Sequence, residues 1–352
     1  MKKSKIAIAM SGGVDSSLVA YILKREGYDI FGLTMKQLDH VENEKLHKPC
    51  CSLEDIIDAK RICNGLGVPH YTLNLKSIFK EKIIDTFIND YKKGSTPNPC
   101  VKCNREVKIG ELIRYAKELG ADYLATGHYS IMKNGKVYSA DDENKDQSYF
   151  LAQIRKEDIE KMVFPLGGLN KSKTRELAAQ FGIITKDKVD SQGVCFIKKS
   201  YKDFLDSKLD ERYKKPGDIV KSNGELVGKH SGVHNYTIGQ RRGIGVSDEV
   251  PLYVIGIDPE NNRLIVGEDR ELYNRELSCT NLNLFMPVEL FNEKEFFVKT
   301  RARDFKNRGK VTVINENELK VVFDNPVRAI TKGQYAVFYH KEGWLAGSGV
   351  IK

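Results

Sequence analysis

The chain has 352 residues, of which 40% are hydrophobic and 30% charged, with seven cysteines and a formal net charge of +9. Its length and composition predict a globular protein of two or three domains. No stretch is apolar enough to span a membrane, and the N-terminal Met-Lys-Lys-Ser-Lys has no signal-peptide core, so we expect a cytoplasmic protein without structural disulfides. The excess of positive charge suits a polyanionic partner.

An apolar strand beginning at Ile6 is followed by Ser-Gly-Gly-Val-Asp-Ser-Ser at positions 11–17 and then by a helix. Gly12 and Gly13 lack a Cβ, so the backbone can turn sharply and approach a ligand closely. We expect Ser16 and Ser17 to cap the helix, whose free N–H groups favour an anion. The stretch is neither a Walker A nor a Gly-x-Gly-x-x-Gly loop, and it resembles the PP-loop of ATP pyrophosphatases. The competing interpretation is an ordinary strand–helix turn.

Strands and helices then alternate along the chain. We predict strands over residues 28–35 and 68–75 and helices over 52–66, with Ser52 as cap, and 78–91. This alternation favours a doubly wound parallel sheet, in which ligands bind at the carboxyl ends of the strands. The PP-loop and Met35 would lie at that edge.

A proline-containing stretch follows at residues 92–104, and its prolines argue against a helix there. We expect Asn104 to cap a helix to about residue 119, a short strand over 122–126, and a hairpin turning at Asn134-Gly135. Helical patterns recur at 156–163 and 171–182. Strand-rich composition from about residue 206 predicts a catalytic domain over 1–205, a small β-rich domain over 206–275 and a β-barrel domain over 276–352.

Three cysteines stand in loops, and three chemical interpretations of them compete. For Cys195, which Val194 and Phe196 flank, a place in the core as a small hydrophobic residue competes as well. Cys100 and Cys103 form a Cys-x-x-Cys motif, and Cys195 lies in a Gly-Val-Cys-Phe loop. One cysteine could be a thiolate nucleophile activated by the helix start and by nearby Lys102 and Arg105, with Cys195 as its partner in persulfide chemistry. The three could instead hold a 4Fe–4S cluster with one open iron. Zinc is the weakest interpretation, because no second Cys or His pair stands at zinc spacing.

The remaining cysteines carry weaker signals. We expect Cys63, on the apolar side of a helix, to be part of the core, and Cys279 to be incidental. Cys50 and Cys51 precede a helix, where redox or metal chemistry competes with a structural role.

Several polar residues are candidates for substrate contact. His128 follows a strand end and could transfer a proton, although an ordinary loop histidine fits as well. Arg241, Arg242 and a basic cluster over residues 299–310 could track a nucleic-acid backbone, although such charge runs often form only a solvated surface.

Taken together, the motifs resemble the tRNA-uridine 2-sulfurtransferases, the MnmA/TrmU family, over essentially the whole chain. The matching segments are residues 11–17, Thr96-Pro97-Asn98-Pro99 with Cys103-Asn104, residues 125–129, 145–151, 193–197 and 236–241, Phe323-Asp324-x-Pro326, and Gly333-Gln334. The resemblance implies an enzyme that uses ATP to adenylate the C2 oxygen of the wobble uridine of tRNA, releases pyrophosphate, and replaces that oxygen with sulfur. A sulfur-donor protein would supply the sulfur.

The resemblance also implies roles for individual residues. Cys103 would be the nucleophile and Cys195 the persulfide carrier, and the two could form a disulfide. The residues expected to bind ATP are Ala9, Met10, Ser11, Gly12, Gly13, Val14, Asp15, Ser16, Ser17, Met35 and Gly127. Those expected to face tRNA are Thr96, Pro97, Asn98, Pro99, Cys100, His128, Lys145, Asp146, Gln147, Arg241, Arg301, Ala302 and Gln334. A Mg²⁺ near Asp15 would offset the charge of the pyrophosphate.

Two residues depart from the family pattern. Cys100 stands where many members have Asp, so this chain is also similar to tRNA thiolases in which three cysteines bind a 4Fe–4S cluster, and persulfide and cluster mechanisms both stay open. Ala302 stands where an aromatic residue is common. The rival function is that of another PP-loop enzyme, an ATP-dependent ligase or amidotransferase, which would need neither the paired cysteines nor a basic β-rich C-terminal half.

Overall fold

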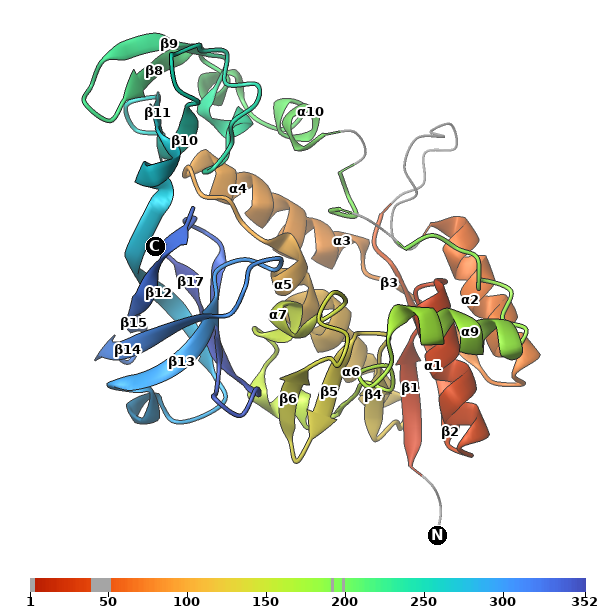
Figure 1. Ribbon diagram of the computed structural model, residues 1–352. Helices are drawn as coiled ribbons and strands as arrows, with labels where there is room; N and C mark the ends of the chain where they lie inside the picture. The colour runs from red at the N-terminus through yellow and green to blue at the C-terminus, as the bar shows by residue number, and fades with distance from the viewer. Residues whose placement is uncertain (1–3, 39–51, 191–192, 198–199) are drawn as a thin grey trace. The chain divides into compact units, whose positions relative to one another are not determined.

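The computed structural model describes residues 4–38, 52–190, 193–197 and 200–352 (Figure 1). Cys50 and Cys51 therefore lie outside the described residues. The chain forms two compact units: residues 1–84, 99–198 and 342–345 make the first, and residues 85–98, 199–341 and 346–352 the second. Within the described ranges, no helix is both long and apolar enough to cross a membrane.

The first unit is built on a five-stranded sheet in the order β3-β2-β1-β4-β7, with every neighbouring pair parallel. Its strands are β1 (Lys5–Ala9), β2 (Asp29–Lys36), β3 (His70–Asn74), β4 (Tyr123–Ala125) and β7 (Met162–Val163). This order confirms the predicted doubly wound parallel sheet. The strand order reverses between β1 and β4, which is where such sheets bind ligands.

Three helices lie side by side against this sheet, as Figure 1 shows: α1 (Val14–Arg25), α2 (Leu53–Gly65) and α9 (Lys171–Gln180). Ile8 of β1, Leu18 of α1 and Ala178 of α9 meet in one buried cluster that also includes Cys63. Burial raises the pKa of the Cys63 thiol to about 11, which confirms that it is a core residue. The predicted cap Ser52 is confirmed, and it forms a capping box with Asp55.

The helical segments between β3 and β4 differ from the prediction. They are α3 (Lys76–Phe79), the π-helical η1 (Lys80–Asp85), α4 (Thr86–Lys92), α5 (Pro99–Cys103), the π-helical η2 (Asn104–Ile109) and α6 (Gly110–Glu118). The expectation that the prolines exclude a helix at 99–103 is wrong, because Pro99 is the first residue of α5, where a missing N–H costs nothing. Asn104 is accordingly not a cap: it is buried, and its Nδ2 donates to the carbonyl of Phe150.

A hairpin and short elements complete the first unit. The predicted turn at Asn134-Gly135 is confirmed, with φ of 51° and 69° at these residues. The elements are β5 (Ser130–Lys133), β6 (Lys136–Ser139), α7 (Ser148–Leu151) and α8 (Lys156–Ile159). The expected helix over 156–163 is wrong beyond α8, because the edge of β4 bonds the following residues as a strand: Thr126 N donates to Val163 O over 3.1 Å.

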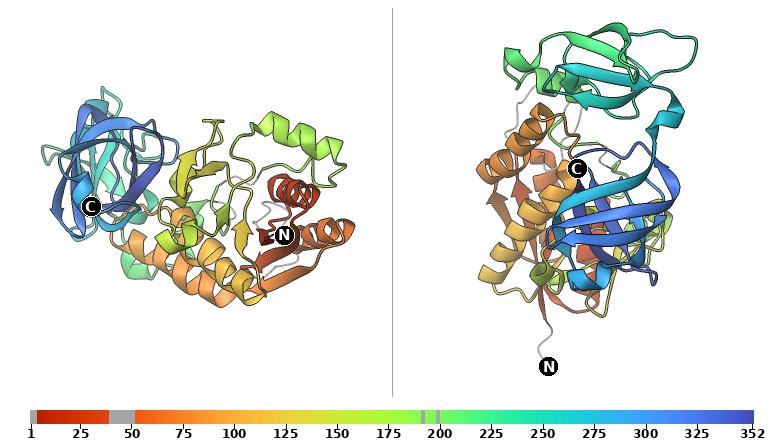
Figure 2. Two further views of the ribbon diagram at one scale, coloured as in Figure 1. Left: turned by 90° about the horizontal axis from the view of Figure 1, so that it is seen from below. Right: turned by 90° about the vertical axis from the view of Figure 1, so that its left-hand side faces the viewer.

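The second unit contains two β structures, visible in the two views of Figure 2. A four-stranded sheet has the order β10-β11-β8-β9, and a closed six-stranded barrel has the order β12-β15-β14-β13-β16-β17, which confirms the expected C-terminal barrel. The strands are β8 (Gly217–Lys221), β9 (Leu226–His230), β10 (Tyr253–Asp258), β11 (Arg263–Gly267), β12 (Tyr273–Leu284), β13 (Lys294–Lys299), β14 (Asn307–Asn315), β15 (Glu318–Arg328), β16 (Tyr335–Tyr339) and β17 (Leu345–Ile351). The helices are α10 (Tyr201–Asp206), η3 (Glu211–Tyr213), η4 (Val233–Asn235), η5 (Asp269–Leu272) and η6 (Val288–Phe291).

Candidate active site

The loop between β1 and α1 has a shape that only glycine permits at one position. Gly12 has φ of +72°, and a Cβ there would lie 2.3 Å from the carbonyl oxygen of Asp55. Gly13 is extended, with φ of −94° and ψ of 169°, and is the N-cap of α1. The backbone thus turns tightly against the start of α2. The first N–H groups of α1 have no partners within the helix, and such N–H groups form an anion site.

The serines of the loop do not cap the helix, contrary to expectation. Because α1 already begins at Val14, Ser16 and Ser17 lie inside its first turn. Ser17 Oγ donates to Gly13 O over 2.8 Å, and Ser16 Oγ accepts from the backbone N of Ser11 over 3.1 Å. These bonds brace the loop from within, so the two serines shape the anion site by fixing its backbone.

The loop after β4 lies against the start of α1. A Cβ on Gly127 would be 3.0 Å from both Asp15 Cβ and Ser16 N, so glycine is what lets this loop reach the first turn of α1. Met10 and Met35, at the ends of the adjacent strands β1 and β2, are both buried. The expected ATP residues of three segments therefore meet at the carboxyl edge of the sheet.

A network of opposite charges covers this edge. Lys171 Nζ lies 2.7 Å from Asp15 Oδ1 and 2.7 Å from Asp190 Oδ1, and only 13% of its side chain is exposed. Lys145 and Arg175 also contact Asp190, at 3.0 and 3.3 Å. Burial would raise the pKa of Asp190, but the hydrogen bonds from Lys171 and Lys145 outweigh it and lower the pKa. Three cations thus converge beside the anion-binding loop.

Asp15 is held in place by Tyr129 as well. The Tyr129 hydroxyl donates to Asp15 Oδ1 over 2.9 Å and lies 2.9 Å from Thr174 Oγ1. Burial, and then the charge of Asp15, raise the pKa of Tyr129 above its ordinary range, so the hydroxyl keeps its proton.

A second lysine connects the loop to α2. Lys188 Nζ donates to Gly12 O over 2.9 Å and to Asp58 Oδ2 over 3.0 Å, and it also contacts Asp55. Burial would lower the pKa of Lys188, but the hydrogen bonds to the two carboxylates raise it. The sequence predicted a role for neither Lys171 nor Lys188, because no local motif marks residues that meet the loop only in the folded chain.

Asp15, beside which a Mg²⁺ is expected, forms an ion pair in this structure. The ammonium group of Lys171 contacts both carboxylate oxygens of Asp15, at 2.7 and 2.9 Å. Across the described ranges, no group of three or more His, Cys, Asp or Glu side chains is arranged to hold a metal ion.

Cys100 and Cys103 lie one turn apart on α5, and both are half-buried. The amide Nε2 of Gln37, a buried residue just after β2, lies 4.0 Å from Cys103 Sγ. Arg105, which was expected to activate a cysteine, instead directs its guanidinium to other residues. It donates to Glu106 Oε1 and Gln153 Oε1 over 3.1 and 2.8 Å.

Cys195 is half-buried in its loop, whereas the side chain of its neighbour Phe196 is buried in the core. The Phe196 ring packs edge-on against Phe79 of α3, with centroids 5.9 Å apart. In the part of the chain that the structure describes, Cys195 does not form a three-residue metal-binding group with Cys100 and Cys103.

His128 is buried, and both of its ring nitrogens have partners. Nδ1 lies 2.8 Å from Thr126 Oγ1, and Nε2 lies 3.3 Å from the ammonium of Lys108. Burial, and then the charge of Lys108, hold the pKa of His128 well below its ordinary value, so the ring is neutral near pH 7. Because an ammonium can only donate, Nε2 accepts and Nδ1 carries the proton. Lys108, which the sequence did not single out, is thus aligned by His128.

The expected tRNA residues at 145–147 are engaged within the protein. Asp146 accepts from Ala140 N and from the backbone and hydroxyl of Ser148, and Gln147 Oε1 accepts from Tyr129 N over 3.0 Å. Lys145 contacts Asp190, as described above. Gln147 and Lys145 are thereby connected to Tyr129 and Asp190, the residues that surround Asp15 and Lys171.

Two other expected tRNA residues meet in the second unit, although they are far apart in sequence. Gln334 Nε2 donates to the carbonyl of Thr96 over 2.7 Å, and Thr96 N donates to Lys332 O over 2.9 Å. Pro97, Asn98 and Pro99 are half-buried. Arg241 is exposed, Ala302 is half-buried, and the guanidinium of Arg301 donates to the carbonyl of Arg328 over 3.0 Å.

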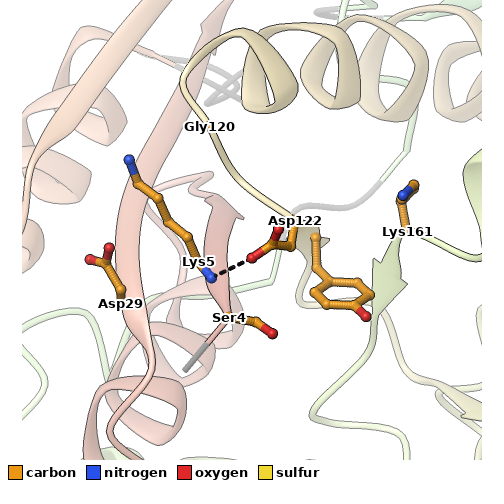
Figure 3. Close-up of a pocket in the computed structure, with 7 residues that line it drawn as sticks. Ser4, Lys5, Asp29, Gly120, Asp122 and Lys161 are labelled. Atoms are coloured by element: carbon orange, nitrogen blue, oxygen red, sulfur yellow. Dashed lines mark hydrogen bonds between the residues drawn. The ribbon is translucent and has the colours of Figure 1, made fainter. Parts of the chain in front are cut away.

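A hollow at the opposite edge of the sheet is shown in Figure 3. It is lined by Ser4, Lys5, Asp29, Gly120, Asp122 and Lys161, among others, at the amino ends of the strands. Lys5 N donates to Asp122 Oδ2 over 2.8 Å. None of the expected site residues lines it.

Known proteins match the chain over nearly its full length. Family models of the tRNA methyl transferase HUP domain, the tRNA methyl transferase PRC-barrel domain and the aminomethyltransferase beta-barrel domain match residues 4–199, 202–268 and 274–351. The tRNA-specific 2-thiouridylase MnmA 1 of Fusobacterium nucleatum is 44% identical over 99% of this chain and 93% of its own length. The tRNA-specific 2-thiouridylase MnmA of Halothermothrix orenii is 41% identical over 99% of both chains. The solved U34-tRNA thiolase NcsA of Methanococcus maripaludis, with its [4Fe-4S] cluster, is 18% identical with a TM-score of 0.35, covering 58% of this chain and 65% of that one, a likeness too weak to bear on the cysteines here.

Proposed function

Since this chain belongs to the family of tRNA-specific 2-thiouridylases, we propose that it uses ATP to replace the C2 oxygen of the wobble uridine of tRNA with sulfur. The observation that carries the proposal is the anion-binding loop at the switch point of the parallel sheet, which three cations border. A polyphosphate with its negative charge fits that setting.

In the first step the C2 oxygen of uridine attacks the α-phosphorus of ATP, and the bond to the β-phosphate breaks. Adenylated uridine forms and pyrophosphate leaves. The N–H groups at the start of α1 would hold the pyrophosphate, and Lys171, positioned by Asp15 and Asp190, would balance the charge that develops on it. Adenylation turns the C2 oxygen into a leaving group.

In the second step a persulfide on Cys195 attacks C2 through its terminal sulfur, and AMP leaves. The thiolate of Cys103 then attacks the Sγ of Cys195, which releases 2-thiouridine and leaves a disulfide between the two cysteines. An external thiol reductant and a persulfide-donor protein complete the cycle. Both cysteines are only half-buried, which supports their use as reactive groups. The nearby amide of Gln37 suits a thiolate at Cys103.

The tRNA would contact both units. Because a base inside the anticodon loop must reach the sheet edge, we expect the uridine to be flipped out of its stack. In the second unit, Thr96 and Gln334, joined by their hydrogen bond, would contact the tRNA. In the first unit, Lys108, aligned by neutral His128, would offer the tRNA a fixed cation.

The test is thiolation of a transcribed tRNA by the full chain, with ATP and a chemical persulfide donor, read out as 2-thiouridine and pyrophosphate. We expect Cys103→Ala and Cys195→Ala to lose thiolation while each still releases pyrophosphate, and Cys100→Ser to stay active. Cys279→Ser, in the barrel wall, is the control for cysteine substitution as such. Loss of activity and of an iron absorption in all three variants at 100, 103 and 195 would instead establish a cluster.

Exchange of labelled pyrophosphate into ATP distinguishes the rival function. An ATP-dependent ligase or amidotransferase would show this exchange with a small amino acid and without tRNA. Exchange that requires tRNA supports the thiolase, and tRNA-independent exchange would overturn it.

A further inference from the structure

The most exposed large apolar side chain in the described part of the chain is Phe305, at 87%. It lies between β13 and β14, on a turn at one end of the barrel. An aromatic ring that is left in water gives up the stabilisation of burial, and its faces stay available to a partner.

The backbone around Phe305 is held rigidly from both sides. Asp304 Oδ1 accepts from Phe305 N over 2.9 Å, while Asn307 Nδ2 donates to Phe305 O over 3.1 Å. The other oxygen of Asp304 accepts from Thr300 Oγ1 over 2.6 Å, and Asp304 N donates to Arg301 O over 3.1 Å. The turn therefore presents the ring in a defined place, which lowers the entropy lost when a partner binds it.

Two cationic residues lie close to Phe305 in the sequence. Arg303 and Lys306 are exposed, and Lys306 Nζ also lies 4.4 Å from the centroid of the Tyr339 ring. The one acidic side chain of the turn is Asp304, and its two oxygens accept hydrogen bonds from Thr300 and Phe305 within the turn. An exposed aromatic side chain on a turn that also carries two exposed cations is the chemistry that binds single-stranded nucleic acid, because every base can stack on the ring while its phosphates meet the cations.

We propose that Phe305 is a stacking platform for an unpaired nucleotide of the RNA substrate, with Arg303 and Lys306 on the adjoining phosphates. The proposal rests on the proposed function only in taking tRNA as the substrate. It assigns a base contact to the barrel, whereas Arg301 turns its guanidinium inward to the carbonyl of Arg328.

The test is equilibrium binding of unmodified tRNA to the full chain over a range of salt concentrations. We expect Phe305→Ala to weaken binding about tenfold, as the loss of one stacked base predicts, without changing the slope of log Kd against log salt. Arg303→Gln should lower that slope by about one, because one phosphate contact is lost. Phe305→Trp should keep the wild-type affinity, since indole stacks as well.

Phe297→Ala is the matched control, because it removes another partly exposed Phe, 38% exposed, from the strand that leads to this turn. We expect it to bind tRNA as wild type does. Phe305→Trp adds a second tryptophan to Trp344, so its emission beyond that of the wild-type protein gives an independent readout, and we expect saturating tRNA to quench that additional emission.

Wild-type affinity in Phe305→Ala, or an unchanged emission of Phe305→Trp at saturating tRNA, would overturn the proposal. A wild-type protein that binds no tRNA at all would instead overturn the proposed function. The two failures are therefore told apart in one experiment.

Discussion

The two edges of the parallel sheet differ in how they use charge. At the amino edge, the hollow of Figure 3 contains Lys5 and Asp122, joined by two hydrogen bonds to the strand backbone. At the carboxyl edge, Lys171 connects Asp15 to Asp190, residues that are far apart in sequence and mostly sheltered from water. A concave surface thus marks the first edge, while the close backbone contact at Gly12 and desolvated charge mark the second, and only the second is costly enough to need a function.

The strongest test of this contrast uses one glycine at each edge. Gly12 and Gly120 both have positive φ, but a Cβ would meet the Asp55 carbonyl at 2.3 Å in the first case and only the end of Lys5, at 4.0 Å, in the second. We expect Gly12→Ala to reduce tRNA-dependent pyrophosphate release below detection. Gly120→Ala should lose only about 1 kcal/mol of unfolding free energy and keep its activity. Thermal unfolding and pyrophosphate release measure both, and equal activity losses would contradict the contrast.

A pair of lysines gives the next largest effect. Lys171→Met removes the cation between two carboxylates, so we expect pyrophosphate release to fall about 100-fold, as for the loss of one transition-state charge contact. Lys161→Met, in the amino-edge hollow, should leave the rate unchanged. A Lys171→Met enzyme with nearly the wild-type rate would show that Lys171 serves only the fold.

The cysteines should differ in alkylation rate. Burial raises the pKa of Cys63 to about 11 and that of Cys279 to about 12, so at about pH 8 both are protonated and shielded. We expect iodoacetamide to modify Cys103 and Cys195 at least tenfold faster than these two. Peptide mass spectrometry over time measures the rates, and early labelling of Cys63 would contradict its place in the core.

The smallest effect is a pH dependence of stability. The folded pKa of His128 lies below the ordinary value of about 6.5, so between these two values the unfolded chain binds more protons. Its contribution is therefore complete above about pH 6.5 and is lost as the pH falls. When the pH is lowered from about 7.5 to about 5, the free energy of unfolding should fall in both proteins. We expect the fall to be about 1 kcal/mol smaller in His128→Asn than in wild type.

His70, at the amino end of β3, is the matched control for that measurement. Burial, and then the charge of Lys60, lower its pKa too, but the ring is only half-buried. His70→Asn should flatten the pH profile by less than His128→Asn does. A larger effect at His70 would reverse the comparison.

Local patterns predicted much of this fold because each rests on neighbouring residues. The glycines of the anion-binding loop, the capping box at Ser52, the hairpin turn at Asn134-Gly135 and the alternating strands of the barrel are all read within a few residues. The wrong predictions concern ambiguous local signals. Pro99 both breaks and begins helices, and the residues of β7 form a strand only because β4 offers a free edge.

Patterns of neighbouring residues thus suffice to predict the parallel sheet, the place of the anion-binding loop, and the cysteines available for chemistry. The groups that surround them follow from the folded chain alone: Lys171, Lys188 and Lys108 contact residues that lie far away in the sequence. Backbone preference acts between neighbouring residues, whereas the energy of an ion pair depends on distance and burial, which exist only once the chain has folded.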